Sequence, residues 1–221
     1  MNYLSRQATQ TKERPIVFNV ETVKGILTGE RTMVRRVVKF KDHLTEDITR
    51  LHIEKKDGDW WLFNEPNGWM IGKPKCPYGE IGERLWVRET WQQVSDQNYL
   101  TYKASYPNDL LEKMPYLENV PSMEQLKEKG YYWNSPVSMP KQFSRLLLEI
   151  TDTRIERLQD ISHQDYEKEG LWSTHKHNYK QEFSKHWDSF YELNSGRRWD
   201  NNPWVWCINF RVIERRSVLS K

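Results

Sequence analysis

The stretch GILTGERTMVRRVVKF, residues 25–40, runs from the end of a predicted helix through a basic turn into a predicted strand. The apolar residues of NVETVKGILTG recur at helical spacing, so we expect a helix that begins after the N-cap Asn19 and ends at Gly29. TMVRRVVKF is rich in β-branched residues, which favours a strand. The cations of this stretch line either a solvated strand edge or a loop that binds an anion: Arg31, Arg35, Arg36 and Lys39.

Most of the remaining pattern also predicts strands. The sharpest signal is Asp57-Gly58 between two β-like runs, which is typical of a hairpin. The chain from residue 64 to 83 is dense in proline and glycine and is expected to form turns. Strands are expected near residues 14–18, 82–91, 99–106, 144–158 (one long strand or two) and 203–213, and short helices near 122–130, 162–170 and 179–193. We therefore predict an α+β fold, mainly β: a small β-barrel with flanking short helices.

The composition indicates a folded, soluble chain without a strong general affinity for anions. Its net charge is only +3, so an anion-binding surface has to be made locally by clustered cations. Eleven Trp and eleven Tyr supply apolar area that a disordered chain lacks. Cys76 and Cys207 form no CxxC pair, and no metal or cofactor is expected. No apolar run approaches the roughly 18 residues of a membrane span and the N-terminus has no signal-peptide core, so we expect a cytoplasmic protein without a membrane partner.

The domain organisation is expected to be simple. Residues 1–13 are polar and without period, which predicts a flexible N-terminal arm. A single domain is expected over residues 14–215, followed by a C-terminal tail at 216–221. Within the domain, the proline-punctuated segment 107–140 is expected to be a surface insertion, and such loops often carry function.

The basic stretch also carries a family motif. GERTMVRR fits the spacing Gly-x-Lys-x-x-x-x-Arg, with Gly29, Arg31 and Arg36 at the three marked positions. GERLWVRETW, PVSMPKQFSRLLLEITDTRIERLQDIS and WDNNPWVWCINFRVIE follow in the expected order. On these residues the chain resembles the ASCH domain family of the PUA-like superfamily, in its phage- and prophage-encoded branch. The resemblance implies a PUA-like barrel, a fold known for RNA recognition.

One departure from the family pattern bears on chemistry. A small bacterial branch of the family hydrolyses N4-acetylcytidine with a lysine, a threonine and a glutamate. Those three positions fall on Arg31, Val34 and Glu169 of this chain. Arginine stays protonated and valine has no hydroxyl group, so the resemblance implies a loop that keeps its charge without that catalytic pair.

Two sets of residues are candidates for binding nucleic acid. In the basic loop they are Arg31, Arg35 and Arg36. Neighbouring residues on a strand point to opposite faces, so only one of Arg35 and Arg36 is expected in the cleft. The motif favours Arg36. The alternative is a buried arginine paired with an acidic residue such as Glu89. The second set offers stacking surfaces and further polar contacts: Trp86, Arg88, Trp91, Lys103, Ser144 and Arg145. The alternative is that these tryptophans belong to the core.

Three functions remain open at this point. The leading hypothesis is a protein that binds nucleic acid, RNA rather than DNA, or a nucleotide, with phosphate contacts for affinity and a stacked base for selectivity. The second is a hydrolase or nuclease, for which the catalytic candidates are Glu169, Glu89 and Thr32. Glu169 is alternatively an exposed residue in the last turn of a helix. The third is a phage accessory or morphogenesis protein that binds another protein. The oligomeric state is left open.

Overall fold

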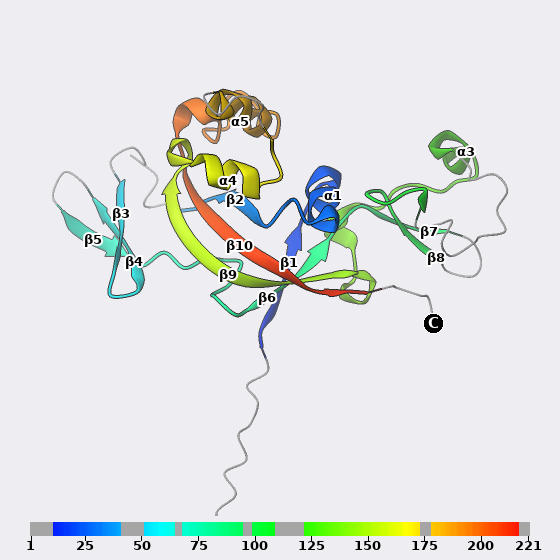
Figure 1. Cartoon of the computed structure of the whole chain (residues 1–221), viewed down its shortest axis with the longest axis horizontal. Helices are drawn as coiled ribbons and strands as arrows, with labels where there is room; N and C mark the ends of the chain where they lie inside the picture. Colours follow the sequence, from blue (N-terminus) through cyan, green and yellow to red (C-terminus); the bar gives the residue numbers. More distant parts are fainter. Residues whose placement is uncertain are drawn as a thin grey trace, which may run out of the picture. The chain divides into compact units, whose positions relative to one another are not determined.

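The computed structural model describes residues 11–40, 51–64, 68–94, 99–108, 122–172 and 178–216 (Figure 1). The chain forms two compact units, each assembled from segments that are distant in sequence. Unit 1 comprises Met1–Phe18, Tyr78–Ile150 and Val212–Lys221, and unit 2 comprises Asn19–Pro77 and Thr151–Arg211. The single domain expected over residues 14–215 stays a prediction. Most of the expected arm and tail, and residues 109–121 of the expected insertion, lie outside the described residues.

The main sheet has five strands in the order β1-β6-β9-β10-β2. The strands are β1 (Glu13–Val17), β6 (Arg84–Arg88), β9 (Leu146–Arg157), β10 (Trp204–Arg215) and β2 (Met33–Val37). β1 pairs with β6 in parallel, whereas β6–β9 and β10–β2 are antiparallel. Among the described residues β1 and β2 are edge strands, and Pro15 suits the edge because its nitrogen donates no hydrogen bond to a further strand. The predicted α+β class is confirmed, but the sheet is open rather than closed into the predicted barrel.

The helix and strand expected from the basic stretch are both confirmed. α1 (Val20–Thr28) begins after Asn19, whose Oδ1 accepts a hydrogen bond from the backbone N–H of Thr22 at 2.8 Å. The helix ends at Gly29, which has a φ of 82° and so occupies the left-handed region that glycine tolerates. β2 follows after a short turn that contains Arg31.

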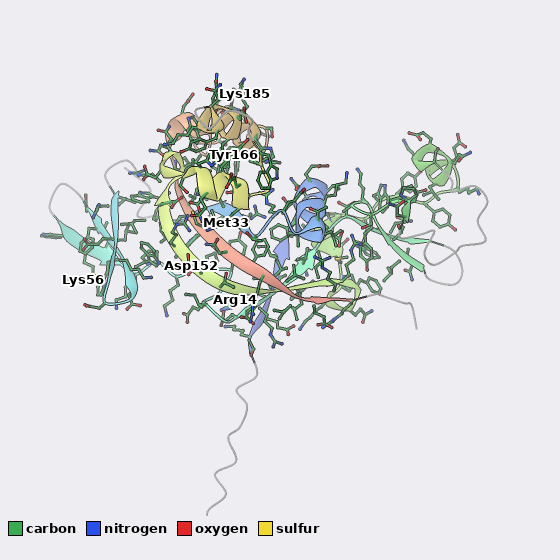
Figure 2. All side chains as sticks on the ribbon, in the orientation of Figure 1. Arg14, Met33, Lys56, Asp152, Tyr166 and Lys185 are labelled. Atoms are coloured by element: carbon green, nitrogen blue, oxygen red, sulfur yellow. The ribbon has the colours of Figure 1, made fainter. Side chains whose placement is uncertain are left out.

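A second, three-stranded sheet of unit 2 has the order β3-β4-β5 (Figures 1 and 2). Its strands are β3 (Leu51–Lys56), β4 (Asp59–Asn64) and β5 (Trp69–Gly72). Asp57 and Gly58 both have positive φ, 52° and 84°, which is the geometry of the predicted hairpin turn. β5 lies where only turns were expected, and this expectation was wrong: the four-residue run WMIG is too short to show a period but pairs with β4.

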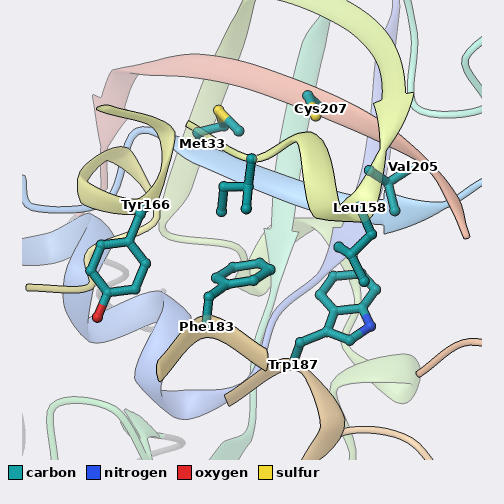
Figure 3. Close-up of a cluster of buried hydrophobic side chains, with 8 residues drawn as sticks. Met33, Leu158, Tyr166, Phe183, Trp187, Val205 and Cys207 are labelled. Carbon is teal, nitrogen blue, oxygen red and sulfur yellow. The ribbon is translucent and has the colours of Figure 1, made fainter. Parts of the chain in front are cut away.

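The core of unit 2 lies between the sheet and two helices, α4 (His163–Lys168) and α5 (Tyr179–Asp188). Figure 3 shows Tyr166, Phe183 and Trp187 reaching from these helices toward the side chains of the strands. The buried cluster consists of Met33, Leu158, Ile161, Tyr166, Phe183, Trp187, Val205 and Cys207. The short helix expected near residues 179–193 is confirmed as α5, which buries Phe183 and Trp187.

Unit 1 contains a smaller two-stranded sheet, β7 (Trp91–Val94) with β8 (Tyr99–Tyr102), and the helix α3 (Met123–Glu128). Ser122 and Gln125 form the capping box at the start of α3. Short 3-10 turns are η3 (Pro136–Ser138) and η4 (Lys141–Phe143) in unit 1, and η5 (Leu158–Asp160) and η6 (Trp199–Asn201) in unit 2. Within the described ranges, no helix has the length and apolar character that a membrane crossing requires.

Candidate ligand-binding pocket

Arg31 is held in place by two glycines and its own backbone. A Cβ atom on Gly25 would lie 3.0 Å from the Arg31 Cβ, and one on Gly170 would lie 3.3 Å from it. The Arg31 backbone N–H donates to the carbonyl oxygen of Gly25 at 2.9 Å, and its Nε donates to the carbonyl oxygen of Met33 at 3.3 Å. The stem of Arg31 is thus confined between α1 and the end of α4, so its guanidinium has a fixed direction.

That guanidinium meets Glu169, the residue that follows α4. Arg31 Nη2 donates to Glu169 Oε2 at 2.9 Å, and Arg35 Nη1 donates to Glu169 Oε1 at 2.6 Å. All three residues are buried, with Glu169 only 3 % exposed. Burial lowers the pKa of Arg31, and the charge of Glu169 opposes this shift. Each carboxylate oxygen of Glu169 therefore accepts a charge-assisted hydrogen bond from a different guanidinium.

Arg35 connects this pair to a larger ionic network. Its Nη2 donates to Glu156 at 2.7 Å and to Asp165 at 3.3 Å. Arg154 donates to the same two carboxylates at 2.9 and 2.6 Å. Burial raises the pKa of Glu156, but the hydrogen bond and charge of Arg35 lower this pKa by more, so it lies below its ordinary value. The formal charges of these three guanidinium groups and three carboxylates cancel, and the more exposed carboxylate of Asp152 lies 3.7 Å from Arg154 at the edge of the network.

A pocket of about 230 Å³ opens over the Arg31–Glu169 pair. This volume lies below the roughly 300–1,000 Å³ of pockets for drug-sized ligands, so the pocket fits a small ligand. It is lined by Asn19, Thr22, Arg31, Val34, Arg35, Arg36, Glu169, Phe183, His186, Trp187, Phe190 and Tyr191. One wall is polar and charged, and the other is aromatic. Phe183 and Trp187 are stacked with centroids 6.0 Å apart, and His186 meets Phe190 edge-on at 4.9 Å.

His186 adds a polar group to the aromatic wall. Burial and the charge of Arg31 lower the pKa of His186, and Glu169 opposes them. His186 is therefore uncharged at neutral pH, and its ring has one donor nitrogen and one acceptor nitrogen.

The arrangement favours binding of an uncharged polar ligand over proton transfer. Both oxygens of Glu169 accept hydrogen bonds from arginines, so a group that gives its proton to Glu169 would have to compete with one of these bonds. Each oxygen keeps a second acceptor site, and Arg31 keeps donors that no carboxylate uses. An acceptor and a donor thus lie side by side at the floor of the pocket. Val34 is buried there and supplies no hydroxyl, although Thr22 on α1 does line the pocket.

The structure brings together four of the candidate residues from the basic loop and α4: Arg31, Arg35, Arg36 and Glu169. Both Arg35 and Arg36 line the pocket, whereas alternation on the strand had predicted one; Arg36 Nη1 turns back to the Arg35 carbonyl oxygen at 3.4 Å. Glu169 is buried rather than exposed. Thr32 is exposed and does not line the pocket; its backbone N–H donates to the carbonyl oxygen of Lys168 at 2.9 Å.

The other candidates lie in unit 1, where Glu89 and Arg145 form a buried pair. Arg145 Nε and Nη2 donate to the two oxygens of Glu89 at 2.8 and 2.9 Å, and its Nη1 donates to Ser105 at 2.7 Å. The guanidinium also lies 4.2 Å from the Tyr102 ring centroid. The sequence had offered a basic-loop arginine as a possible partner of Glu89, and the structure pairs Glu89 with Arg145.

The two candidate tryptophans of unit 1 are buried. Trp86 and Trp91 are 8 % and 9 % exposed, and Arg88 covers the Trp86 ring at 4.6 Å. Ser144 is buried, with its hydroxyl donating to the Val87 carbonyl oxygen at 2.9 Å, and Lys103 is exposed. The nucleic-acid candidates are thus divided between two units, and a role for the unit 1 set stays a prediction.

Sequence reasoning missed several members of the site. Arg154 and Glu156 alternate with apolar residues in ITDTRIER, which signals a charged face on a strand but not a pocket. Asp165 on α4 contacts Arg35 on β2 and Arg154 on β9, and no spacing in the sequence connects these residues. Thr22 and His186 gave no signal of their own. Among the described residues, no group of His, Cys, Asp or Glu has the arrangement of a metal site.

Comparisons with known proteins add little to this geometry. No family model matches the chain, and no curated protein matches it. Among solved structures, the chain is similar to an ASCH domain from Lactobacillus crispatus JV V101, with a TM-score of 0.36 and 9 % identity over 92 % of this chain and 81 % of that one. A likeness at this level carries no conclusion about the fold or function of this chain.

Proposed function

We propose that this chain is an ASCH-type protein that binds single-stranded nucleic acid, RNA in preference to DNA, and that its unit 2 pocket takes one unpaired base. The observation that carries the proposal is the pocket itself, with a fixed donor–acceptor pair facing an aromatic wall. Base edges present donors and acceptors side by side, and base faces stack on aromatic side chains. The preference for RNA rests on the resemblance of the sequence to the ASCH family.

The charges of the pocket support a base rather than a phosphate inside it. A phosphate would meet the carboxylate of Glu169, and the arginines beside it are already paired with carboxylates. A phosphate inside the pocket would have to compete with these buried carboxylates for the guanidinium groups, whereas an uncharged base would not. Arg36 lines the same pocket and supports one phosphate contact at most. The sequence had predicted that these arginines bind phosphate; the geometry favours a structural role for Arg35.

Hydrolysis has weaker support. The two hydroxyl groups named from the sequence do not meet a carboxylate in one pocket, since Thr32 is exposed and Ser144 bonds to backbone in unit 1. Both oxygens of Glu169 already accept hydrogen bonds from two guanidinium groups. Thr22 is the hydroxyl that does line the pocket. Incubating labelled RNA with the protein and looking for shorter products tests this function directly.

Filter binding with a 12-nucleotide single-stranded RNA, the matching DNA and an RNA duplex tests the proposal. We expect the single-stranded RNA to bind best and the duplex worst, because a paired base cannot enter the pocket. Glu169→Gln removes a charged acceptor and should weaken binding by about 10-fold or more, since a hydrogen bond to a charged group contributes about 1.5–3 kcal/mol. The matched control is Glu167→Gln, which makes the same change on α4 outside the pocket lining.

Because Glu169 is buried, a second variant protects the test from loss of folding. Phe190 lines the pocket but is 50 % exposed, so Phe190→Ala should fold normally and still weaken RNA binding by about 5-fold or more through lost stacking. Leu193→Ala, at a site 80 % exposed, is its control. Absence of RNA binding at low salt, or unchanged affinity in the folded Phe190→Ala variant, would contradict the proposal.

A further inference from the structure

We infer that the outward face of the β3–β4–β5 sheet is a second contact surface, on which bases of a single strand stack outside the pocket. The inference rests on the proposed function and extends it to a part of unit 2 that the pocket does not use. We call this surface the aromatic face and define it by His52, Trp61, Phe63, Met70 and Lys73.

The strand register places these side chains on one face of the sheet. Phe63 of β4 lies opposite His52 of β3 and opposite Met70 of β5. Trp61 is two residues from Phe63 and therefore points to the same face. Side chains directly opposite each other on neighbouring strands are about 5 Å apart at Cβ, so His52, Phe63 and Met70 form a continuous row across three strands.

Burial shows which face of the sheet is covered. Leu51, Ile53 and Leu62 alternate with the row and are 4 %, 7 % and 3 % exposed, so this part of the opposite face is packed. On the aromatic face, Met70 is 56 % exposed and the His52 side chain 52 %. A soluble sheet usually presents polar residues on its open side. An apolar row there is the arrangement by which RNA-binding sheets stack bases.

Cations accompany the aromatic rings of β4. Lys73 Nζ lies 4.0 Å from the Trp61 ring centroid, and Lys55 Nζ lies 5.7 Å from that of Trp60 on the opposite face of the sheet. Trp61 thus contributes a ring with a lysine over it. Phe63, whose ring centroid lies 6.5 Å from that of His52, is the residue on which we place a base. Single-strand binders combine stacking rings with cations that follow the phosphates.

Acidic and basic residues both occur on this sheet. Asp59 accepts from Lys73 at 2.7 Å, and Glu54 lies 3.7 Å from the imidazole of His52. Over residues 51–64 and 68–75, four lysines (Lys55, Lys56, Lys73 and Lys75) stand against three acidic residues (Glu54, Asp57 and Asp59), a small excess of positive charge. We therefore place the phosphate chain at the Lys73 end of the row, where the carboxylate of Asp59 is paired.

A folded protein partner fits this face less well. A stable protein interface buries about 800 Å² on each partner. The apolar part of the aromatic face is limited to Phe63, Met70 and the edge of Trp61, on strands of four to six residues. A few stacked bases need only such a narrow row, because each base is held by its own ring contact.

The test compares one nucleotide with a longer strand, using fluorescence anisotropy of the full chain with fluorescein-labelled U12 RNA and competition by UMP. Phe63→Leu keeps the apolar packing of this half-buried residue but removes its ring. We expect about 5- to 10-fold weaker U12 binding and unchanged UMP competition in this variant. Lys73→Gln should lower the slope of log affinity against log salt concentration by about one unit. Because Lys73 is exposed, this substitution leaves the packing of the core unchanged.

The control is Trp69→Ala. Trp69 pairs with Asn64 and therefore points to the other face of the same strand, where it is 73 % exposed. We expect U12 affinity within about twofold of the wild-type value. Two results would overturn the inference while leaving the pocket proposal standing. One is a U12 affinity of Phe63→Leu equal to that of the wild type, together with an unchanged salt slope in Lys73→Gln. The other is a loss of U12 affinity in Trp69→Ala as large as the loss in Phe63→Leu. Failure of the wild-type chain to bind either RNA probe would overturn both.

Discussion

Replacing Arg35 by methionine tests whether the ionic network is a structural support of the pocket. Arg35 has a fully buried side chain that bonds to Glu169, Glu156 and Asp165 at 2.6–3.3 Å. Methionine retains an apolar stem but leaves these carboxylates short of one cation. Removing one partner of a buried pair costs about 3–5 kcal/mol, a large share of the roughly 5–15 kcal/mol by which domains are stable.

The assay is urea unfolding followed by tryptophan fluorescence. With a slope of about 1–3 kcal/mol per molar urea, a loss of 3–5 kcal/mol lowers the midpoint by roughly 2 M. Arg154→Met is the matched control, because it removes a cation from two of these carboxylates, Glu156 and Asp165. The Arg154 side chain is 27 % exposed, so water replaces part of its contacts. We expect a loss of about 1 kcal/mol there.

Two results would refute this reasoning. One is a free energy of unfolding for Arg35→Met within about 1 kcal/mol of wild type, the size of an exposed pair. The other is equal destabilisation by the two substitutions. Adding Glu169→Gln to Arg35→Met should cost less than the sum of the single changes, by about 0.5–3 kcal/mol, because the two groups contact each other.

Three further predictions concern the same pocket. Gly25→Ala should raise helix propensity by about 1 kcal/mol but press on Arg31, so we expect no gain in melting temperature and weaker RNA binding; a more stable variant with full affinity would contradict the confinement of Arg31. The pKa of Glu156 is lowered in the folded state, so its ionised form stabilises the fold above the unfolded pKa, and this stabilisation is lost as the pH falls through the folded pKa. Urea midpoints measured between pH 7 and 3 should show this loss of stability, and the loss should be smaller in Arg35→Met. The lowered pKa of His186 keeps the wall uncharged at neutral pH, so affinity for an uncharged nucleoside should fall only below pH 6.5, and His186→Gln should remove this dependence; affinity that rises on acidification would indicate an anion in the pocket.

Local signals in the sequence predicted the elements that frame the pocket. α1 was predicted because Asn19 and Gly29 are capping residues whose effect depends only on neighbouring backbone. The hairpin at Asp57-Gly58 was predicted for the same reason. β5 was missed because four residues carry no measurable period, and its strand conformation depends on pairing with β4. The open sheet was missed because closure depends on how edge strands meet, which no local signal encodes.

The site was predicted only where a motif or resemblance pointed to it. Arg31 and Glu169 are 138 residues apart, and no spacing rule connects them; the family comparison alone placed both in one site. The partners of Arg35 follow from the packing of α4 against β2 and β9, so charge in the sequence indicated a phosphate contact where the fold builds a buried pair. Phe183 and Trp187 of the aromatic wall also belong to the buried cluster of unit 2.

The central claim is that the pocket takes an unpaired base rather than a phosphate group. Competition against the labelled 12-nucleotide RNA by unlabelled adenosine, cytidine, guanosine, uridine and inorganic phosphate at matched ionic strength tests it most directly. We predict that at least one nucleoside displaces the RNA, that this displacement weakens in Phe190→Ala, and that phosphate does not displace it. Displacement by phosphate, with none by any nucleoside, would contradict the claim.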